Sequence, residues 1–332
     1  MSITVAPVGH SRILSVGTYR PKRVVPNSEI VDRIDSTDEW IVQRTGIESR
    51  RFAGDDESVI SMAKAACEIA LKRAKLTIAD IDTVILSTIS YPFQAPSAAT
   101  ELINELGNPK AAAFDISAAC AGFCYGVAMG SDLVRSGTSK NVLVIGVEKL
   151  SDYTDPDDRA TAFIFADGAG AVVIGQSDQP RIGQTIWGSD ADSRGAITLT
   201  PSFLDFKKNP DKGVGELGWP NISQQGQVVF RWAVYSMSKV GLKALEAAGV
   251  SVDELGAFIP HQANVRIIET MAKEMKIPDS VLIADDIRTN GNTSAASIPL
   301  AMDRILEEHP ELHGKLALLI GYGAGLVYAG QV

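Results

Sequence analysis

The sequence predicts an α/β protein built from two similar halves. Three observations support this. Apolar runs of strand length alternate with stretches of helical periodicity, those runs lack strict polar alternation, and one glycine-rich element occurs twice. Continuously apolar strands separated by helices are typical of a sheet that is buried on both faces. The chain has 332 residues, 45% of them hydrophobic, which is enough to bury such a core.

Strands and helices are expected to alternate along most of the chain. Short continuous apolar runs indicate the strands, and apolar residues that recur at steps of three and four indicate the helices. The expected strands are residues 83–90, 111–116, 141–147, 171–175, 257–260, 281–284, 315–321 and 326–330. The expected helices are residues 58–74, 97–106, 121–136, 227–248, 265–274 and 295–308.

A weak internal repeat supports the duplication. Residues 168–176, GAGAVVIGQ, align with residues 323–331, GAGLVYAGQ. Upstream of each copy a small-residue segment opens a helix, Ser117–Cys120 in the first case and Ser294–Ser297 in the second. Chance recurrence of Ala and Gly is the alternative explanation.

The repeat divides the chain into residues 1–178 and residues 179–332. Between the two copies lies a Gly- and Pro-rich stretch, residues 178–226. We expect this stretch to be an irregular connection between the halves.

Composition excludes several classes of protein. Acidic residues outnumber basic ones by 40 to 31, a net charge of −9, which argues against nonspecific nucleic-acid or anionic-membrane binding. The first residues lack the basic and apolar regions of a secretory signal, and the uncharged run at residues 316–332 is short and holds four glycines. We therefore expect no nucleic-acid partner and no membrane partner.

The three cysteines, Cys67, Cys120 and Cys124, are too few for a disulfide framework. No Cys/His grouping has the spacing of a zinc site, so no metal site is expected. These features place the protein in a reducing cytoplasm.

Cys120 is the first candidate for chemistry. It follows the strand expected at 111–116 and precedes the helix expected at 121–136. A thiol at a helix N-terminus faces unpaired backbone N–H groups and the positive end of the helix dipole, which favour a thiolate nucleophile. A small buried hydrophobe is the alternative, and it is the interpretation that we adopt for Cys67 and Cys124, which lie inside helical patterns.

Two side chains of the second half are further candidates. His261 ends an apolar strand just before a helix, a position that can project a side chain into a crevice. Asn292 lies in a turn-forming stretch that occupies, in the second half, the place of Cys120 in the first. A helix-capping histidine and an N-cap or tight-turn asparagine are the alternatives. If the duplication holds, the loops that carry Cys120 and Asn292 converge at the junction of the halves.

Five ordered segments are specific enough to identify a family. They are DEWIVQRTGI at 38–47, SAACAGF at 117–123, FADGAG at 165–170, PHQAN at 260–264 and GNTSAAS at 291–297. Together they resemble β-ketoacyl-acyl carrier protein synthase III, the initiating condensing enzyme of dissociated bacterial fatty-acid synthesis, and the resemblance runs nearly end to end. It implies the thiolase fold, a duplicated five-layered α-β-α-β-α arrangement, in agreement with the internal repeat.

By this resemblance, Cys120 takes an acyl group from acyl-CoA and holds it as a thioester. Malonyl-acyl carrier protein then loses carbon dioxide, and its carbanion attacks the acyl carbon to give 3-ketoacyl-acyl carrier protein. His261 and Asn292 stabilise the enolate, and His261 would also help to ionise Cys120. The backbone N–H groups of Cys120 and Ala324 form the oxyanion hole for acyl transfer, although many family members have glycine in place of Ala324. CoA thioester is a substrate here, and no cofactor is expected.

The resemblance also assigns residues to CoA recognition. Trp40 would stack on adenine and Arg44 would contact phosphate. Alternatively, Trp40 packs in the core, and Arg44 pairs with Glu39 or Glu48. The further CoA contacts that the family implies are Arg159, Gly226, Phe230 and Asn264.

Docking of an acidic carrier protein on this acidic chain requires a local cationic patch. Arg266 matches the carrier-docking arginine of the family. Other basic residues on the two expected helices would complete the patch, or would simply be a solvated surface. They are Arg231, Lys239, Lys243, Lys273 and Lys276.

In the family, a residue in the loop before the helix expected at 97–106 crosses a homodimer and closes the acyl pocket of the partner. Ala95 stands near that point, and its small side chain predicts a pocket for primers longer than acetyl. Two other functions stay open. One is a thiolase-fold acyltransferase of a specialised pathway that works without decarboxylation, and the other is a non-catalytic subunit that binds acyl-CoA or carrier protein. No cysteine follows Cys124, which argues against a thiolase with a second catalytic cysteine.

Overall fold

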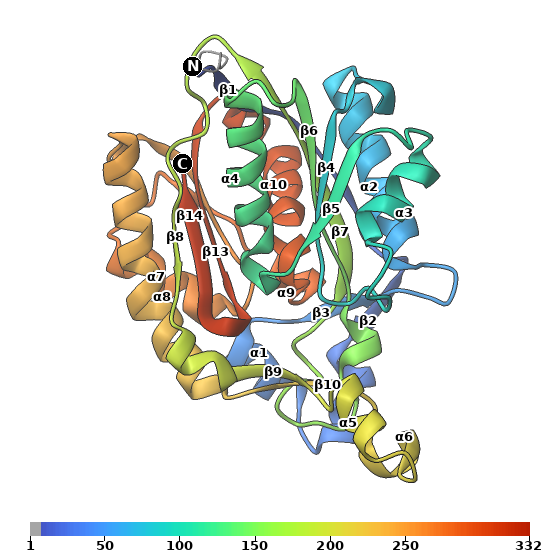
Figure 1. Ribbon diagram of the computed structural model, residues 1–332. Coiled ribbons are helices and arrows are strands. Elements are labelled where there is room, and N and C mark those ends of the chain that lie inside the picture. Colours follow the sequence, from blue (N-terminus) through green and yellow to red (C-terminus); the bar gives the residue numbers. More distant parts are fainter. Residues whose placement is uncertain (1–7) are drawn as a thin grey trace.

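The computed structural model describes residues 8–332, and two five-stranded sheets form its framework (Figure 1). The first sheet has the strand order β1-β7-β6-β4-β5. In it β4 is parallel to β5 and β6, whereas β7 is antiparallel to β6 and β1. Its strands are β1 (His10–Tyr19), β4 (Thr83–Ser87), β5 (Ala112–Ile116), β6 (Asn141–Lys149) and β7 (Asp167–Ser177).

The second sheet repeats this arrangement with the order β8-β14-β13-β11-β12. Here β11 is parallel to β12 and β13, whereas β14 is antiparallel to β13 and β8. Each strand of one sheet therefore has a counterpart of the same direction in the other. The strands are β8 (Ile186–Ser189), β11 (Leu255–Pro260), β12 (Leu282–Ile283), β13 (Leu316–Gly323) and β14 (Val327–Gln331).

Helices cover both faces of both sheets and give five layers (Figure 1). The outer layers are α2 and α3 on the first sheet and α7 and α8 on the second. Between the sheets lie α4 and α10, whose residues Val127 and Ile298 share one buried cluster with strands of both sheets. The bounds are α2 (Val59–Ala74), α3 (Ala98–Leu106), α4 (Gly122–Arg135), α7 (Gly226–Ala248), α8 (Val265–Glu274) and α10 (Ser297–Glu308).

Local sequence explains where these elements begin and end. Ser58 caps α2 in a reciprocal pair with Ser61, which satisfies N–H groups that the helix itself cannot pair. Gly107 ends α3 and Gly249 ends α7, both in the left-handed conformation at φ 87° and 66°, which only glycine adopts without strain. Strand β4 is buried along its whole length, as its continuously apolar sequence predicts.

The predicted strands and helices are all present, with ends that differ by a few residues. The thiolase-like five-layered α/β fold predicted from the sequence is confirmed. The division at residue 178 stays a prediction, because the second-half helix α10 packs against β1 and β7 of the first sheet.

The prediction of an irregular connection over residues 178–226 is wrong. This stretch supplies edge strand β8 of the second sheet and a small two-stranded sheet of β9 and β10. These strands are only four residues long and largely exposed, so they carry little apolar pattern. The elements outside the layers are α1 (Asp38–Thr45), α5 (Phe203–Lys208), α6 (Gly213–Leu217), α9 (Ile287–Asn290), β2 (Arg23–Pro26), β3 (Ser49–Phe52), β9 (Ile197–Thr200) and β10 (Asn221–Gln224).

Candidate active site

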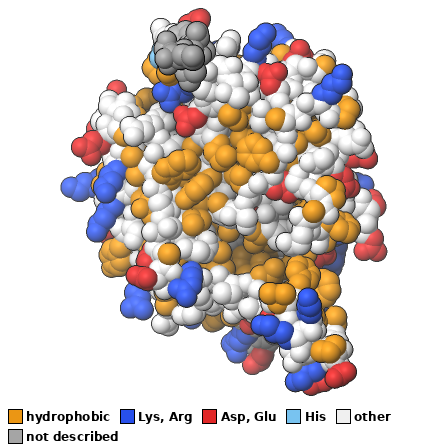
Figure 2. All heavy atoms as spheres, viewed as in Figure 1, with side chains coloured by type: hydrophobic (Ala, Val, Ile, Leu, Met, Phe, Trp, Pro, Cys, Tyr) orange, Lys and Arg blue, Asp and Glu red, His pale blue; other side chains and the backbone are white. Residues whose placement is uncertain are grey.

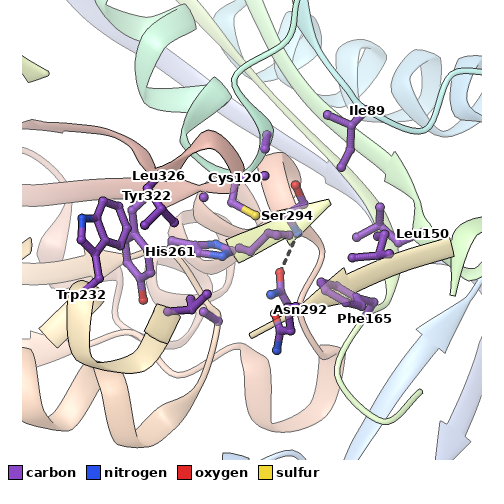
Figure 3. A pocket seen from close by; sticks show the side chains of 18 residues that line it. Ile89, Cys120, Leu150, Phe165, Trp232, His261, Asn292, Ser294, Tyr322 and Leu326 are labelled. Atoms are coloured by element: carbon purple, nitrogen blue, oxygen red, sulfur yellow. Dashed lines mark hydrogen bonds between the residues drawn. The ribbon is translucent and has the colours of Figure 1, made fainter. Parts of the chain in front are cut away.

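Loops from both sheets meet around one pocket of about 520 Å³, part of it open to solvent. Cys120, His261 and Asn292 all line this pocket (Figure 3). The structure therefore brings together the three side chains that the sequence singled out. The apolar part of the lining includes Ile89, Leu150, Phe165, Trp232, Tyr322 and Leu326.

Cys120 lies in a short turn between β5 and α4. Ala119, just before it, adopts the left-handed conformation at φ 44°. This bend turns the chain from strand to helix and presents Cys120 at the pocket wall. Cys120 is partly exposed, whereas Cys67 in α2 and Cys124 in α4 are buried, as interpreted from their helical settings.

The expectation of a thiolate at Cys120 stays a prediction, and burial of the sulfur opposes it. Burial raises the pKa of the Cys120 thiol to about 12, and the nearby Glu148 acts in the same direction. The Ser294 hydroxyl lowers the pKa, but by less than burial raises it. Desolvation of the sulfur therefore opposes the effect of the helix N-terminus, which favours ionisation.

His261 directly follows β11 and is held on three sides. Its backbone N–H donates to the Ile320 carbonyl at 2.7 Å, and its ring meets Tyr322 edge-on with centroids 5.1 Å apart. Its Nδ1 lies 2.7 Å from the Ser297 Oγ, which also accepts the Gln262 N–H at 3.3 Å. In the tautomer in which the Ser297 O–H donates to Nδ1, the ring proton sits on Nε2.

Burial lowers the pKa of His261 to about 3, so the imidazole is neutral. A neutral ring with its proton on Nε2 donates a hydrogen bond and is a poor acceptor for a thiol proton. The expectation that His261 helps to ionise Cys120 stays a prediction. The helix-capping alternative is wrong, because Asn264 caps α8 by accepting the Arg266 N–H at 2.8 Å.

Asn292 is tied to the first half through its backbone. Its N–H donates to the Ile164 carbonyl and its carbonyl accepts from the Ala166 N–H, both at 2.9 Å. Its Oδ1 accepts the Ser294 N–H at 2.8 Å (Figure 3). Asn292 is thus a turn residue, as one interpretation held, and this same bond makes its Nδ2 the end of the amide that is available to donate.

The glycine-rich turn after β13 touches Cys120 directly. A Cβ at Gly323 would lie 2.7 Å from the Cys120 nitrogen and 2.8 Å from its Cβ, too close for any side chain. Gly325 adopts φ 79°, which favours glycine. Ala324, between them, lines the same pocket as Cys120.

The two loops are symmetric, but not in the register that the sequence suggested. Ser294 has φ 48° and opens the turn before α10, as Ala119 with φ 44° opens the turn before α4. Ala119 therefore matches Ser294, and Cys120 matches Ala295. The alignment of Ser117–Cys120 with Ser294–Ser297 is wrong by two residues, because runs of Ala and Ser match in several registers.

A second hollow on the surface is lined by Trp40, Gln43, Arg44 and Arg266. The guanidinium groups of Arg44 and Arg159 lie 5.3 and 5.7 Å from the centre of the Trp40 ring. Within residues 8–332 Arg44 forms no ion pair, contrary to one alternative. Arg159 also pairs with Asp35 at 3.7 Å, so the half-buried Trp40 and Arg44 are the groups available to a planar anionic ligand.

The other residues assigned to CoA differ in their placement. Asn264 donates through Nδ2 to the Arg44 carbonyl at 3.1 Å, and the Arg266 guanidinium lies 5.8 Å from the centre of the Phe230 ring. Asn264 and Phe230 therefore border the second hollow. Gly226 is exposed at the start of α7 and lines neither pocket, although the space around its Cα is open.

The six basic residues assigned to carrier docking are all exposed on α7, on α8 or just beyond α8. In the part of the chain that the structure describes, none of them is in an ion pair; the basic side chains on this side of the molecule are visible in Figure 2.

Ala95 is exposed and precedes a cis peptide bond to Pro96, and it does not line the pocket of its own chain.

Sequence reasoning missed the polar groups beneath the pocket. Glu148 is fully buried at the end of β6, and Ser294 and Ser297 are buried in the second-half loop. The detectable signal was Glu148, a charged residue at the end of an otherwise apolar strand. The two serines carried no signal, because serine is equally common in turns.

Among residues 8–332, no helix is long and apolar enough to cross a membrane. Within the same range, no group of three or more His, Cys, Asp or Glu side chains is arranged to hold a metal ion.

Comparison with known proteins agrees with the fold and the pocket, which define a thiolase-fold acyltransferase. Models of the N- and C-terminal parts of 3-oxoacyl-[acyl-carrier-protein] synthase III match residues 114–191 and 245–332. β-Ketoacyl-[acyl-carrier-protein] synthase III 1 of Streptomyces coelicolor is 54% identical over 97% of this chain and 96% of its own. The Kocuria rhizophila synthase III is 52% identical over 98% and 97%.

Two solved structures extend the comparison. The priming β-ketosynthase of the R1128 polyketide pathway has a TM-score of 0.96 and 42% identity, covering 100% of this chain and 98% of its own. The synthase III of Aquifex aeolicus has a TM-score of 0.87 and 37% identity, covering 96% and 98%. The chain belongs to the 3-oxoacyl-[acyl-carrier-protein] synthase III family and is a condensing acyltransferase.

The buried neutral His261 has a measurable consequence for stability. Between its ordinary pKa of 6.5 and its lowered pKa of about 3, the unfolded chain binds a proton that the folded chain does not. The free energy of unfolding therefore falls as pH falls through this window, by about 2 kcal/mol between pH 8 and pH 5. Urea denaturation at both pH values should show this loss in the parent but not in His261→Asn.

Glu148 contributes with the opposite sign, because burial raises its pKa to about 7, but it is present in both proteins and cancels in their difference. Replacement of the exposed His313 by Asn is the control and should leave the parental pH dependence unchanged. An equal loss in the parent and in His261→Asn would contradict the neutral buried imidazole.

Proposed function

We propose that this protein condenses an acyl-CoA primer with malonyl-acyl carrier protein, with Cys120 as the nucleophile and His261 and Asn292 as the donors for decarboxylation. The observation that carries the proposal is the convergence of these three side chains on one pocket beside the Gly323–Gly325 turn. The products are 3-ketoacyl-acyl carrier protein, CoA and carbon dioxide. No step in this scheme uses a cofactor.

In the first half-reaction, the Cys120 sulfur attacks the thioester carbonyl and CoA departs. The backbone N–H groups of Cys120 and Ala324 stabilise the oxyanion that forms. The close contact of Gly323 with Cys120 supports this role, because it fixes the two amide groups relative to each other. The apolar walls of the pocket suit an acyl chain.

In the second half-reaction, the malonyl group loses carbon dioxide, and its enolate attacks the acyl carbon. Enolate oxygen needs donors and no strong base, which suits the neutral His261 Nε2–H and the Asn292 Nδ2–H. The Ser297 contact with Nδ1 and the Ser294 contact with Oδ1 orient these donors. Both donors are therefore held in place before the substrate arrives.

The surface of the molecule offers groups that suit both substrates. Trp40, Arg44 and Arg159 suit the adenine and phosphate groups of CoA. The unpaired cations on α7 and α8, with Arg266 beside the second hollow, suit an acidic carrier protein. A homodimer is proposed through β5, the edge strand of the first sheet, whose outer backbone groups have no partner strand within residues 8–332.

The residue roles predict two separable defects. Cys120→Ser should abolish formation of the acyl-enzyme, whereas Asn292→Ala should keep acylation and lower condensation by about a hundredfold or more. Intact-protein mass spectrometry after incubation with acyl-CoA measures the first step, and labelled carbon dioxide released from malonyl-acyl carrier protein measures the second. Cys67→Ala is the matched control and should acylate normally.

The same measurements separate the alternatives. Parental condensation in Asn292→Ala would contradict its role. Acylation and transfer without carbon dioxide would favour the specialised acyltransferase, and no acylation of Cys120 by any acyl-CoA would favour a binding subunit.

The choice of primer tests the proposed contact of Ala95 with the acyl pocket of the partner. If Ala95 faces the acyl pocket of the partner, the parent should accept branched and longer primers, and Ala95→Phe should shift the preference toward acetyl-CoA. Rates with acetyl-, isobutyryl- and dodecanoyl-CoA measure the preference, and sedimentation confirms that both proteins are dimers. Strict acetyl selectivity in the parent would refute the large pocket, and an unchanged preference in a dimeric Ala95→Phe would refute the role of Ala95.

Carrier docking is tested by charge reversal. Lys239→Glu combined with Lys243→Glu should raise the KM for malonyl-acyl carrier protein several-fold and leave acylation by acyl-CoA unchanged, because only the carrier step uses this surface. The matched control is Lys72→Glu combined with Lys75→Glu, at the end of α2 on the first sheet. Equal effects of the two pairs would indicate nonspecific electrostatics.

A further inference from the structure

A buried carboxyl group lies under the proposed nucleophile and has no role in the scheme above. Glu148 is 0% exposed at the end of β6. Its Oε2 accepts hydrogen bonds from Ser90 Oγ at 2.6 Å, Ile89 N–H at 3.1 Å and Thr88 Oγ1 at 3.2 Å. Its Oε1 has no hydrogen-bond partner among the described residues.

Ser294 neighbours both this carboxyl and the thiol. Its side chain is 1% exposed, and its backbone is held at φ 48° with its N–H bonded to Asn292. Its hydroxyl is near enough to interact with both Cys120 and Glu148, yet it forms no hydrogen bond of normal geometry within residues 8–332. Figure 3 shows the Cys120 sulfur beside Ser294.

Two unpaired polar atoms so deeply buried need an explanation, because folded proteins rarely leave such atoms without a partner. The three groups have complementary hydrogen-bonding roles. The thiol is a donor, the Ser294 hydroxyl both accepts and donates, and the free Glu148 oxygen is an acceptor. A small movement that shortens both gaps would join them into one chain. Apo sites often have catalytic hydrogen bonds that are longer than in the reacting complex.

The thiol also needs such an acceptor. Burial favours the protonated form of Cys120 and the neutral form of His261, whose Nδ1 is engaged by Ser297. With its ring proton on Nε2, His261 would not take up the proton that must leave when the sulfur attacks a thioester. Burial raises the pKa of Glu148 to about 7, so this carboxyl can take up and release a proton near neutral pH.

We propose that Ser294 and Glu148 form a proton relay that serves Cys120 in both half-reactions. The proposal rests on the acylation of Cys120 argued above. In the first half-reaction, the thiol proton passes to Ser294 Oγ as the Ser294 proton passes to Glu148 Oε1. The sulfur bonds to the acyl carbon, the bond from that carbon to the CoA sulfur breaks, and the CoA thiolate takes a proton from water.

In the second half-reaction the relay runs backward. The malonyl carbon–carboxylate bond breaks to release carbon dioxide, and its electron pair becomes the enolate. The enolate carbon bonds to the acyl carbon and the bond to Cys120 sulfur breaks. Glu148 then returns its proton through Ser294 to the departing thiolate. The full cycle consumes one proton, the one that CoA takes up, and leaves Cys120 and Glu148 as they began.

Two titratable groups interact with Glu148 at this position. Cys120 lies on the turn before α4, and Tyr153 lies on the turn after β6. The neighbouring Lys149 is directed elsewhere, with its Nζ donating to the Gly54 carbonyl at 3.0 Å. The groups that the remaining neighbours present to Glu148 are the uncharged ones of Thr88, Ile89, Ser90 and Ser294.

The test is the rate of acylation, followed by rapid quench and intact-protein mass spectrometry across pH 5.5–9 with acetyl- and isobutyryl-CoA. In the parent the rate should rise with pH through about 7, where the Glu148 carboxyl ionises. Glu148→Gln and Ser294→Ala should each lower the rate by about a hundredfold or more and remove this rise. The double variant should be no slower than either single one, because the two residues act as a unit.

Ser90→Ala is the matched control. It removes a hydrogen bond to the other oxygen of the same carboxyl, so a structural role of Glu148 would affect it similarly, whereas the relay would retain its pH dependence. Ser294→Ala removes only one hydroxyl, so it still tests the relay if Glu148→Gln does not fold. The relay alone would be overturned if the parent acylates and the variants acylate at the parental rate. It would also be overturned if the variants are slower but keep the parental pH profile. A parent that never acylates would overturn the proposed function.

Discussion

The contact between the Gly323 backbone and Cys120 is the constraint on which the site depends. It joins the end of β13 in the second sheet to the turn before α4, which follows β5 of the first sheet, with no room for a Cβ. A similar contact runs the other way, because a Cβ at Gly146 would lie 2.1 Å from the Ala295 carbonyl oxygen. Backbone packed against backbone resists adjustment by side-chain rotation. Groups that belong to different sheets are thereby held at fixed separations, which is what stabilising a developing charge requires.

Burial at this junction also determines which chemistry is available. It disfavours charge on Cys120 and on His261, and so favours a resting site of a neutral thiol, a neutral imidazole and an amide. Such a site suits an enolate, whose charge exists only during the reaction and meets donors that need no reorganisation. The same burial makes ionisation of the thiol difficult, so a site of this kind must provide a route for one proton.

Much of the fold and the central residues could be predicted from the sequence, for identifiable reasons. Strands such as β4 are buried on both faces and carry an unbroken apolar signal. Cys120 and His261 stand at the ends of such strands, where topology alone brings side chains together. Strand β1, HSRILSVGTY, was not predicted, because alternating polar residues and a mid-strand glycine weaken its pattern. The effect of burial on Cys120 could not be predicted, because the helix end is visible in the sequence whereas desolvation depends on the assembled pocket.

The two matching loops use the same backbone conformation for two purposes. Ala119 and Ser294 both adopt the left-handed conformation, which costs a non-glycine residue of order 1 kcal/mol and persists where surrounding structure enforces it. In the first half this bend presents the Cys120 thiol. In the second half it presents Ser294, and the N–H of that residue orients Asn292. Glycine would relieve the strain and still supply the N–H, but it would not supply the hydroxyl. A side chain at the strained position, whose oxygen has no partner among the described residues and lies beside the Cys120 thiol and a buried carboxyl, favours a role for that oxygen in chemistry over a role in folding.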